Sequence, residues 1–149
     1  MSKLALYGGE PLIKYRFNKY NSIGLEEEKA VSNVMKSRVL SGFVANTGDG
    51  FYGGPKVQEF EKYCKDYFNV KHAITLNSWT SGLVAALGAI GLEPGDEVIV
   101  SPWTMSASAT AILHWCAIPI FADIEPDTFC IDPVSVESNI SKKTKAILA

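Results

Sequence analysis

The fold of this chain is decided by the stretch Thr75-Leu76-Asn77-Ser78-Trp79-Thr80-Ser81-Gly82-Leu83-Val84-Ala85-Ala86-Leu87. An apolar β-type run over residues 72–76 stops at Asn77, and a helix of small residues is expected to begin near Thr80 after a short polar turn. The first amides of a helix have no partner inside it, and with the helix dipole they attract an anion, above all a phosphate. The stretch therefore predicts either a phosphate site at a strand–turn–helix junction or merely a capped helix of an α/β fold.

The composition of the chain sets limits on its class. Its 149 residues are 47% hydrophobic with a net charge of −2, as in one ordinary domain or a piece of a larger protein. This balance favours neither nucleic-acid binding nor disorder, and no apolar run is long enough to span a membrane. Residues 1–9 lack the apolar core of a signal peptide, and the three cysteines and two histidines form no metal or redox motif. We therefore expect a cytoplasmic protein without a metal site.

Strands and helices alternate from residue 72 onward. Strands are expected at 72–76, 97–100, 118–122 and 145–149, and helices at 81–90, 105–116 and 133–140. The alternation predicts an α/β fold with a mostly parallel sheet and helices on both faces. Pro119 removes a hydrogen-bond donor from its ladder, so its strand should lie at an edge of the sheet. Ligands of such sheets bind at the carboxyl ends of strands, which are followed here by residues 77–80, residues 101–105 and Asp123.

The first half of the chain is less regular. An irregular tail over residues 1–21 leads to a helix expected at 25–36 with an acidic first turn, and then to a glycine-rich loop with aromatic residues at 37–54. Loops of this length are usually functional, so we expect this one to face a substrate or a second subunit. The next helix begins at Pro55, and its apolar stripe is interpreted as core. The stripe consists of Val57, Phe60, Cys64, Tyr67 and Phe68.

Several short motifs follow one another along the chain in an informative order. They are Leu4-Ala5-Leu6-x-Gly8-Gly9-x-Pro11, Leu40-Ser41-Gly42, Gly53-Gly54-Pro55-x-Val57-x-x-Phe60-Glu61, Asn77-Ser78-x-Thr80-Ser81, Gly91-Leu92-x-Pro94-Gly95-Asp96-Glu97-Val98-Ile99-Val100, Phe121-Ala122-Asp123-Ile124 and Asp127-Thr128-Phe129. Their order and spacing resemble the N-terminal part of the DegT/DnrJ/EryC1/StrS aminotransferases, which are pyridoxal 5'-phosphate (PLP)-dependent enzymes of sugar and cyclitol biosynthesis. The resemblance implies the aspartate aminotransferase fold, fold type I. Residues 1–54 would form an N-terminal tail, helix and loop, and residues 55–149 an incomplete PLP-binding large domain.

The resemblance also implies which residues bind the cofactor. In the family, the turn after the first strand binds the PLP phosphate, and Thr80 and Ser81 occupy those places here, with Ser78 beside them. The family usually has Gly or Ala at the position of Trp79, so this indole must point away from the phosphate or narrow the pocket. An aromatic residue after the second strand normally stacks on the pyridine ring. Its place falls on Met105, whose thioether can lie on a ring, and Trp103 is the alternative.

The catalytic residues of the family are not found in this sequence. The Schiff-base lysine and the aspartate that pairs with the pyridine nitrogen are expected beyond Ala149, since no lysine here stands in the family's lysine context. The chain is thus expected to be part of a longer homodimeric enzyme and to be inactive alone. It is also expected to fold poorly alone, because the family fold places strands from beyond residue 149 between residues 72–76 and the other strands, so that residues 72–76 would stay unpaired. Loop 37–54 is the candidate for a segment lent to the second subunit.

The implied reaction transfers an amino group from glutamate or glutamine to a keto-sugar or keto-cyclitol. One alternative is a PLP-dependent sugar dehydratase of the same family, because the region that would distinguish the two is not in this sequence. The other is a non-catalytic α/β nucleotide-binding module, which is weakened by the lack of a Gly-x-Gly-x-x-Gly turn after any expected strand.

Overall fold

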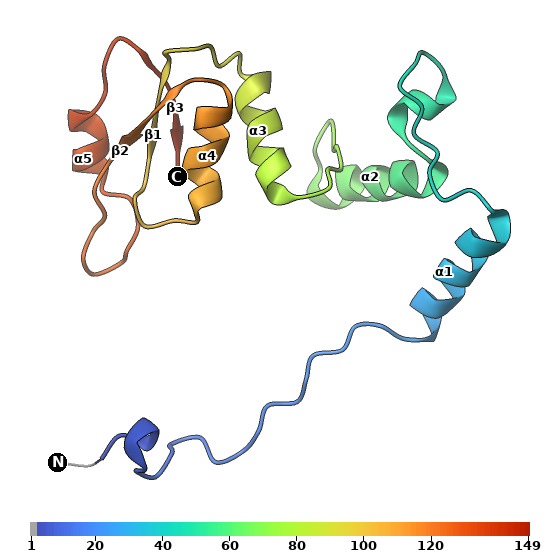
Figure 1. Ribbon diagram of the computed structural model, residues 1–149, viewed down its shortest axis with the longest axis horizontal. Helices are drawn as coiled ribbons and strands as arrows, with labels where there is room; N and C mark the ends of the chain where they lie inside the picture. The colour runs from blue at the N-terminus through green and yellow to red at the C-terminus, as the bar shows by residue number, and fades with distance from the viewer. Residues whose placement is uncertain (1–2) are drawn as a thin grey trace. The chain divides into compact units, whose positions relative to one another are not determined.

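The structure, a computed structural model, describes residues 3–149 and falls into two compact units, one ending at Phe60 and the other covering Glu61–Ala149 (Figure 1). The first unit contains helix α1 (Leu25–Ser37), the short 3-10 helices η1 (Ala5–Tyr7) and η2 (Asp49–Tyr52), and the beginning of α2 (Pro55–Phe68). The second unit contains the rest of α2, a parallel sheet and helices α3, α4 and α5.

Helix α1 begins where the acidic first turn predicts it. The Glu27 carboxylate accepts a 2.7 Å hydrogen bond from the Gly24 N–H, one of the amides that precede the first helical bond. This bond, with a second from the backbone of Glu27, lowers the pKa of the carboxyl group. The helix ends at Ser37, and the following Arg38 has a φ of 61°, the left-handed conformation that terminates many helices.

The glycine-rich loop of the first unit closes on itself. The Val44 N–H donates a 2.8 Å hydrogen bond to the Gly50 carbonyl, and a Cβ on Gly42 would lie only 2.6 Å from the Gly54 Cα. Glycine is required at residue 42 because the two backbones approach so closely. The large aromatic side chains of the loop are exposed, so its own contacts do not bury them.

Helix α2 begins at Pro55 as predicted but does not have the predicted burial. Its apolar stripe was interpreted as core, and this interpretation is wrong for the structure: no residue of α2 is buried, and Phe60 and Tyr67 are 56% and 70% exposed. A helix buries a stripe only when another element packs on it. Within Glu61–Ala149, the stripe residues Tyr67 and Phe68 stay exposed.

Three parallel strands form the sheet of the second unit. They are β1 (Glu97–Val100), β2 (Ile118–Phe121) and β3 (Thr144–Leu148), in the order β2-β1-β3. Ile99 of β1 is paired with Ile120 on one side and Ile147 on the other. The sequence prediction that the strand with Pro119 lies at an edge is confirmed, because β2 has a neighbour on one side only.

The strand predicted for residues 72–76 is not formed, and this prediction is wrong for the structure, but the segment is unpaired, as the family resemblance implied for this chain alone. A strand exists only where a neighbour completes its ladder of hydrogen bonds, and the described sheet offers this segment none. Instead, the N–H of Thr75 donates to the carboxylate of Glu61 on α2. The segment before α3 is therefore held by a side-chain contact, and not by pairing with the sheet.

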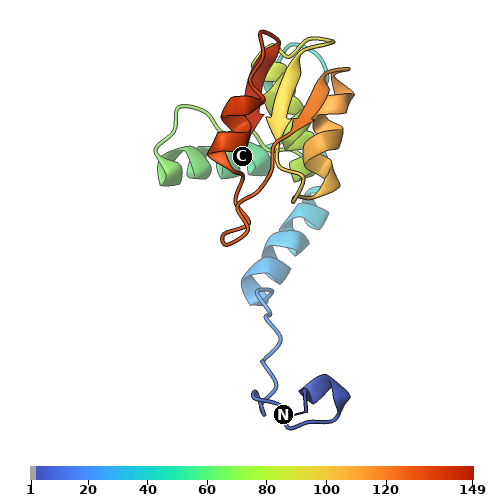
Figure 2. The same cartoon turned by 90° about the vertical axis from the view of Figure 1, so that its left-hand side faces the viewer.

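The helices of the second unit cover both faces of the sheet (Figures 1 and 2). Helices α3 (Trp79–Ala89) and α4 (Ser106–His114) pack together on one face, and α5 (Pro133–Ser138) lies on the other. The central strand is covered on both sides, since Val98, Ile99 and Val100 are at most 1% exposed. Such a continuous apolar run is typical of a buried parallel strand.

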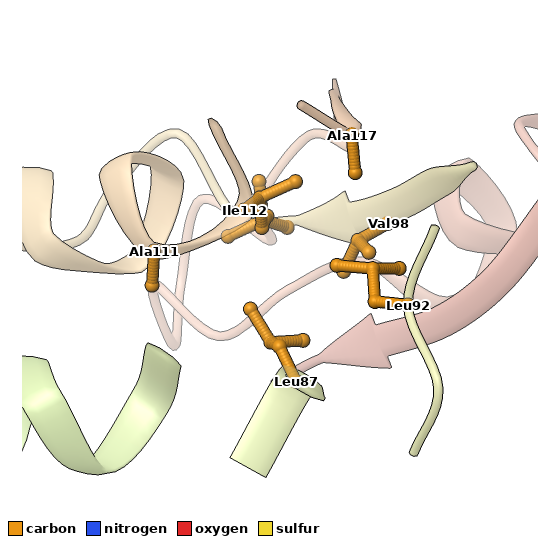
Figure 3. Packing of buried hydrophobic residues seen from close by; sticks show 7 residues of the cluster. Leu87, Leu92, Val98, Ala111, Ile112 and Ala117 are labelled. Atoms are coloured by element: carbon orange, nitrogen blue, oxygen red, sulfur yellow. The ribbon is translucent and has the colours of Figure 1, made fainter. Parts of the chain in front are cut away.

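One hydrophobic cluster joins α3, α4 and the sheet (Figure 3). It consists of Leu87, Leu92, Val98, Val100, Ala111, Ile112 and Ala117. Trp115, which follows α4, extends this core: its indole N–H donates a 2.9 Å hydrogen bond to the Val84 carbonyl. The ring lies so close to Gly88 that a Cβ there would be 2.2 Å from Trp115 Cζ2. Helix α3 is thereby fixed against the end of α4.

Candidate functional site

In the second unit, helices begin on the side of the sheet where the strands have their carboxyl ends. Strand β1 runs toward the end at which α3 and α4 begin, and residues 101–105 join β1 to α4 at that edge (Figure 1). Asp123 follows β2 in the same sense, because the two strands are parallel. This is the edge at which open α/β sheets bind ligands.

The N-terminus of α3 presents unpartnered backbone amides. Ser78 is the N-cap, and its Oγ accepts a 3.2 Å hydrogen bond from the Ser81 N–H. The amides of Trp79 and Thr80 have no acceptor among the described residues, and the Thr80 side chain is exposed. The first turn carries no acidic residue. The first turn of α3 therefore offers two free amides, an exposed hydroxyl group and the positive end of the helix dipole.

Ser81 takes part in the cap itself. Besides the backbone bond, its Oγ lies 3.1 Å from the Oγ of Ser78. The amide of Ser81 therefore already donates to a side chain of the cap. Three residues were predicted to bind the phosphate. Among the described residues, Thr80 is the one of these three whose amide and side chain both make no hydrogen bond.

The indole of Trp79 lies against Gly82, which is one turn further along α3. A Cβ on Gly82 would be 3.0 Å from Trp79 Cε3, and Gly82 is buried. The ring therefore packs on the flank of the helix, while Trp79 as a whole is 78% exposed. That the indole points away from the phosphate or narrows its pocket stays a prediction.

Two candidates for a ring-binding side chain lie in the loop between β1 and α4. Trp103 packs on Phe129, with ring centroids 5.7 Å apart and planes inclined by 32°. Met105 is the N-cap of α4, and its side chain is 79% exposed. One face of the indole is thus occupied by Phe129, whereas the thioether is free to contact a ligand.

Phe129 is carried by a hairpin that sequence reasoning missed. Ile124 and Ile131 form an antiparallel bridge, and the Asp132 N–H donates a 2.8 Å hydrogen bond to the Asp123 carbonyl. Phe129, at the turn, has a φ of 58°. The hairpin starts at the carboxyl end of β2 and brings its aromatic tip to Trp103. The only local signal was the pair Pro126-Asp127, which is typical of a turn.

Comparison with known proteins decides the family. Residues 29–149 match the model of the DegT/DnrJ/EryC1/StrS aminotransferase family. The chain belongs to this family. The family resemblance predicted from the sequence motifs is confirmed.

Relatives of this DegT/DnrJ/EryC1/StrS chain are found among both sequences and structures. The spore coat polysaccharide biosynthesis protein SpsC of Bacillus subtilis is 44% identical over 85% of this chain and 30% of its own length. A putative L-glutamine:3-amino-2,3-dideoxy-scyllo-inosose aminotransferase of Micromonospora echinospora is 32% identical over 98% of this chain and 33% of its own. The PLP form of a putative sugar aminotransferase from Streptococcus pneumoniae has a TM-score of 0.72 at 33% identity, covering 85% of this chain and 29% of that one. The chain thus spans about a third of the length of these relatives.

The structures of family members identify the observed fold. The predicted α/β class with a parallel sheet and flanking helices is confirmed, and it is the fold type I architecture of PLP-dependent aminotransferases. Solved relatives include a PLP form and a PMP form. In this DegT/DnrJ/EryC1/StrS chain, the donor set at the start of α3 suits the phosphate of such a cofactor, because it combines free amides with hydroxyl groups and lacks a carboxylate.

Two further observations complete the site. Among residues 3–149, no group of three or more His, Cys, Asp or Glu side chains is arranged to hold a metal ion. Over the same residues, no helix combines the length and the apolar character needed to cross a bilayer.

Proposed function

We propose that this chain contributes the phosphate-binding side of the site in a PLP-dependent aminotransferase. The proposed reaction transfers an amino group from glutamine or glutamate to a keto-sugar or keto-cyclitol. The observation that carries the proposal is the pair of free amides at the N-terminus of α3, in a chain that belongs to the DegT/DnrJ/EryC1/StrS family. Relatives whose names specify an amino donor support the donor class: one is a 3-oxo-glucose-6-phosphate:glutamate aminotransferase and another an L-glutamine:2-deoxy-scyllo-inosose aminotransferase.

The residues of the site have distinct roles in this proposal. The amides of Trp79 and Thr80 and the Thr80 hydroxyl would hold the phosphate, and the hydroxyls of Ser78 and Ser81 would add donors if their mutual contact opened. Met105 would contact the pyridine ring, while Trp103 supports the loop through Phe129. Bound PLP supplies an electron sink for chemistry at the carbon that carries the amino group. The chain's own part is to hold the phosphate and to orient the ring.

The other parts of the active site are proposed to lie outside these residues. No lysine of this sequence stands in the context of the family's cofactor lysine, so residues 1–149 expressed alone should show no transamination. We also propose a cytoplasmic homodimer in which loop 37–54 is lent across the subunit boundary. Its exposed aromatic side chains, 50% to 72% accessible, support that role. In this division, residues 55–149 belong to the PLP-binding large domain and residues 1–54 precede it.

The proposal is tested on the whole protein by titration with PLP, followed through the visible absorbance of the bound cofactor. We expect saturable binding, and then conversion of the bound cofactor to its amino form by glutamine or glutamate, with amino transfer to a keto-sugar or inosose. Loss of water from the sugar without net amino transfer would instead identify a dehydratase. Failure to bind PLP, with binding of a nucleotide in its place, would contradict the proposal.

Replacement of the two ring candidates should separate their roles. The Met105→Ala variant should bind PLP roughly twofold to tenfold more weakly and shift its absorbance, because a sulfur–aromatic contact contributes about 0.3–1.5 kcal/mol. The Trp103→Ala variant should instead lose about 0.5–1.5 kcal/mol of stability, the contribution of an aromatic pair, and Phe129→Ala should match it. PLP titration and urea unfolding measure the two effects. The opposite pattern would assign the ring contact to Trp103.

A further inference from the structure

Glu61 makes the contact that holds the segment leading into α3. Its Oε1 accepts two hydrogen bonds from Thr75, one from the backbone N–H at 2.8 Å and one from the side-chain hydroxyl at 2.9 Å. The two residues are 14 apart in sequence and both are partly buried. One carboxylate oxygen of α2 thus binds both donors of a single residue that lies three positions before the Ser78 cap.

This contact takes the place of a strand ladder. Residues 72–76 do not pair with the described sheet, so the Thr75 amide would otherwise lack an acceptor. Hydrogen bonds to an ionised carboxylate are roughly twice as strong as neutral ones, and two donors on one oxygen restrict the rotation of the Thr75 backbone. The segment before α3 is therefore held by Glu61, and the later turns of the helix are held by the Trp115 contacts with Val84 and Gly88.

We propose that Glu61 is a positioning residue of the cofactor-phosphate site, an inference that rests on the proposed function of the α3 N-terminus. Its negative charge repels a phosphate, so it cannot act as a phosphate ligand itself. It acts through Thr75, whose two bonds set the direction in which the amides of Trp79 and Thr80 point. A displacement of about 1 Å in a functional group can reduce activity about a hundredfold. The contact that orients these amides should therefore matter for cofactor binding.

The proposal is tested with four variants of the whole protein and two probes, PLP and pyridoxal, which lacks the phosphate. Glu61→Ala should weaken PLP binding by about tenfold to a hundredfold and leave pyridoxal binding unchanged, because only the phosphate contact depends on the junction. Glu61→Gln keeps an acceptor oxygen for both donors and should restore PLP affinity to within about threefold of wild type. Thr75→Val loses only the hydroxyl donor, so its PLP affinity should lie between those of Glu61→Ala and Glu61→Gln.

Glu59→Ala is the matched control. Glu59 lies on the same helix, is exposed, and pairs only with the neighbouring Lys56 among the described residues. Its removal should change neither probe's affinity. Hydrogen exchange provides a readout independent of cofactor: the amides of residues 72–80 should exchange faster in Glu61→Ala than in wild type or in Glu59→Ala.

The outcomes separate the inference from the proposed function. Two results overturn the positioning role alone. One is that Glu61→Ala binds PLP and pyridoxal more weakly by the same factor. The other is that its PLP binding and the hydrogen exchange of residues 72–80 both equal those of wild type. A wild-type protein that binds PLP no better than pyridoxal overturns the proposed function, and the inference with it. A loss specific to PLP that Glu61→Gln restores, with faster exchange at the junction, establishes the role.

Discussion

The Thr80→Asp variant of the whole protein is expected to bind PLP at least about a hundredfold more weakly than wild type while its helix α3 becomes more stable. The amides at the start of α3 are free and the first turn has no acidic residue. A carboxylate there interacts favourably with the helix dipole, which contributes roughly 0.3–1 kcal/mol to stability. The same carboxylate occupies the amides that would bind the phosphate, and two like charges 4 Å apart repel by about 4 kcal/mol at an effective dielectric constant of 20. Affinity and stability should therefore change in opposite directions.

The control for this prediction is Thr80→Asn, which has nearly the same shape as aspartate but no charge. It should lose less than about tenfold in PLP affinity, since neutral polar residues are well tolerated at helix N-termini. Isothermal titration with PLP and with pyridoxal, together with urea unfolding, measures both effects. PLP binding by Thr80→Asp that equals wild type would place the phosphate elsewhere than at α3.

The elements with local signals could be predicted from the sequence. Strand β1 has the expected bounds because Pro94-Gly95-Asp96 forms the turn before it, with Gly95 at a φ of 87°. Helix α5 begins at Pro133 because Asp132 accepts a 2.9 Å hydrogen bond from the Val134 N–H. These signals operate over a few residues, so they need no knowledge of the rest of the fold.

The wrong predictions concern elements that depend on a distant partner. Residues 72–76 have the composition of a strand, but a strand requires a neighbour, and the described sheet ends at β2 and β3. The stripe of α2 has helical spacing, but spacing alone does not provide a surface to cover it. For residues 72–76 the family resemblance implied that the neighbouring strands lie beyond residue 149, whereas the spacing of the α2 stripe gave no sign that it would stay uncovered.

In the candidate site, too, the local features could be predicted and the contacts between distant residues could not. A helix N-terminus near Thr80 could be predicted because Ser78 is a favourable cap. The contacts that orient it could not, because Glu61 and Thr75 are 14 residues apart and Trp103 meets Phe129 only through the hairpin. The resemblance to the family marked both Phe60-Glu61 and Asp127-Thr128-Phe129 as motifs without indicating what either side chain contacts.

The largest loss of stability is expected from Ile112→Ala. Ile112 is fully buried between α3, α4 and the sheet, in the cluster with Val98 and Leu87 (Figure 3). Truncation of a buried isoleucine removes its transfer free energy and leaves a cavity, which together cost about 2–5 kcal/mol. Urea unfolding of the whole protein, followed by far-UV circular dichroism, should show this decrease in the free energy of unfolding.

The next residue of the same helix is the matched control. Leu113 is 56% exposed, so Leu113→Ala should change the free energy of unfolding by less than about 0.5 kcal/mol. Ile112 lies nearly two turns from the start of α4, and its loss leaves the free amides of α3 and the Met105 side chain in place. PLP affinity of Ile112→Ala, measured where the variant is still folded, should therefore stay close to that of wild type. Equal destabilisation by both alanine variants would show that the face of α4 assigned to the core is wrong. A loss of PLP affinity in Ile112→Ala as large as that in Thr80→Asp would show that the cofactor site and the core are not separable.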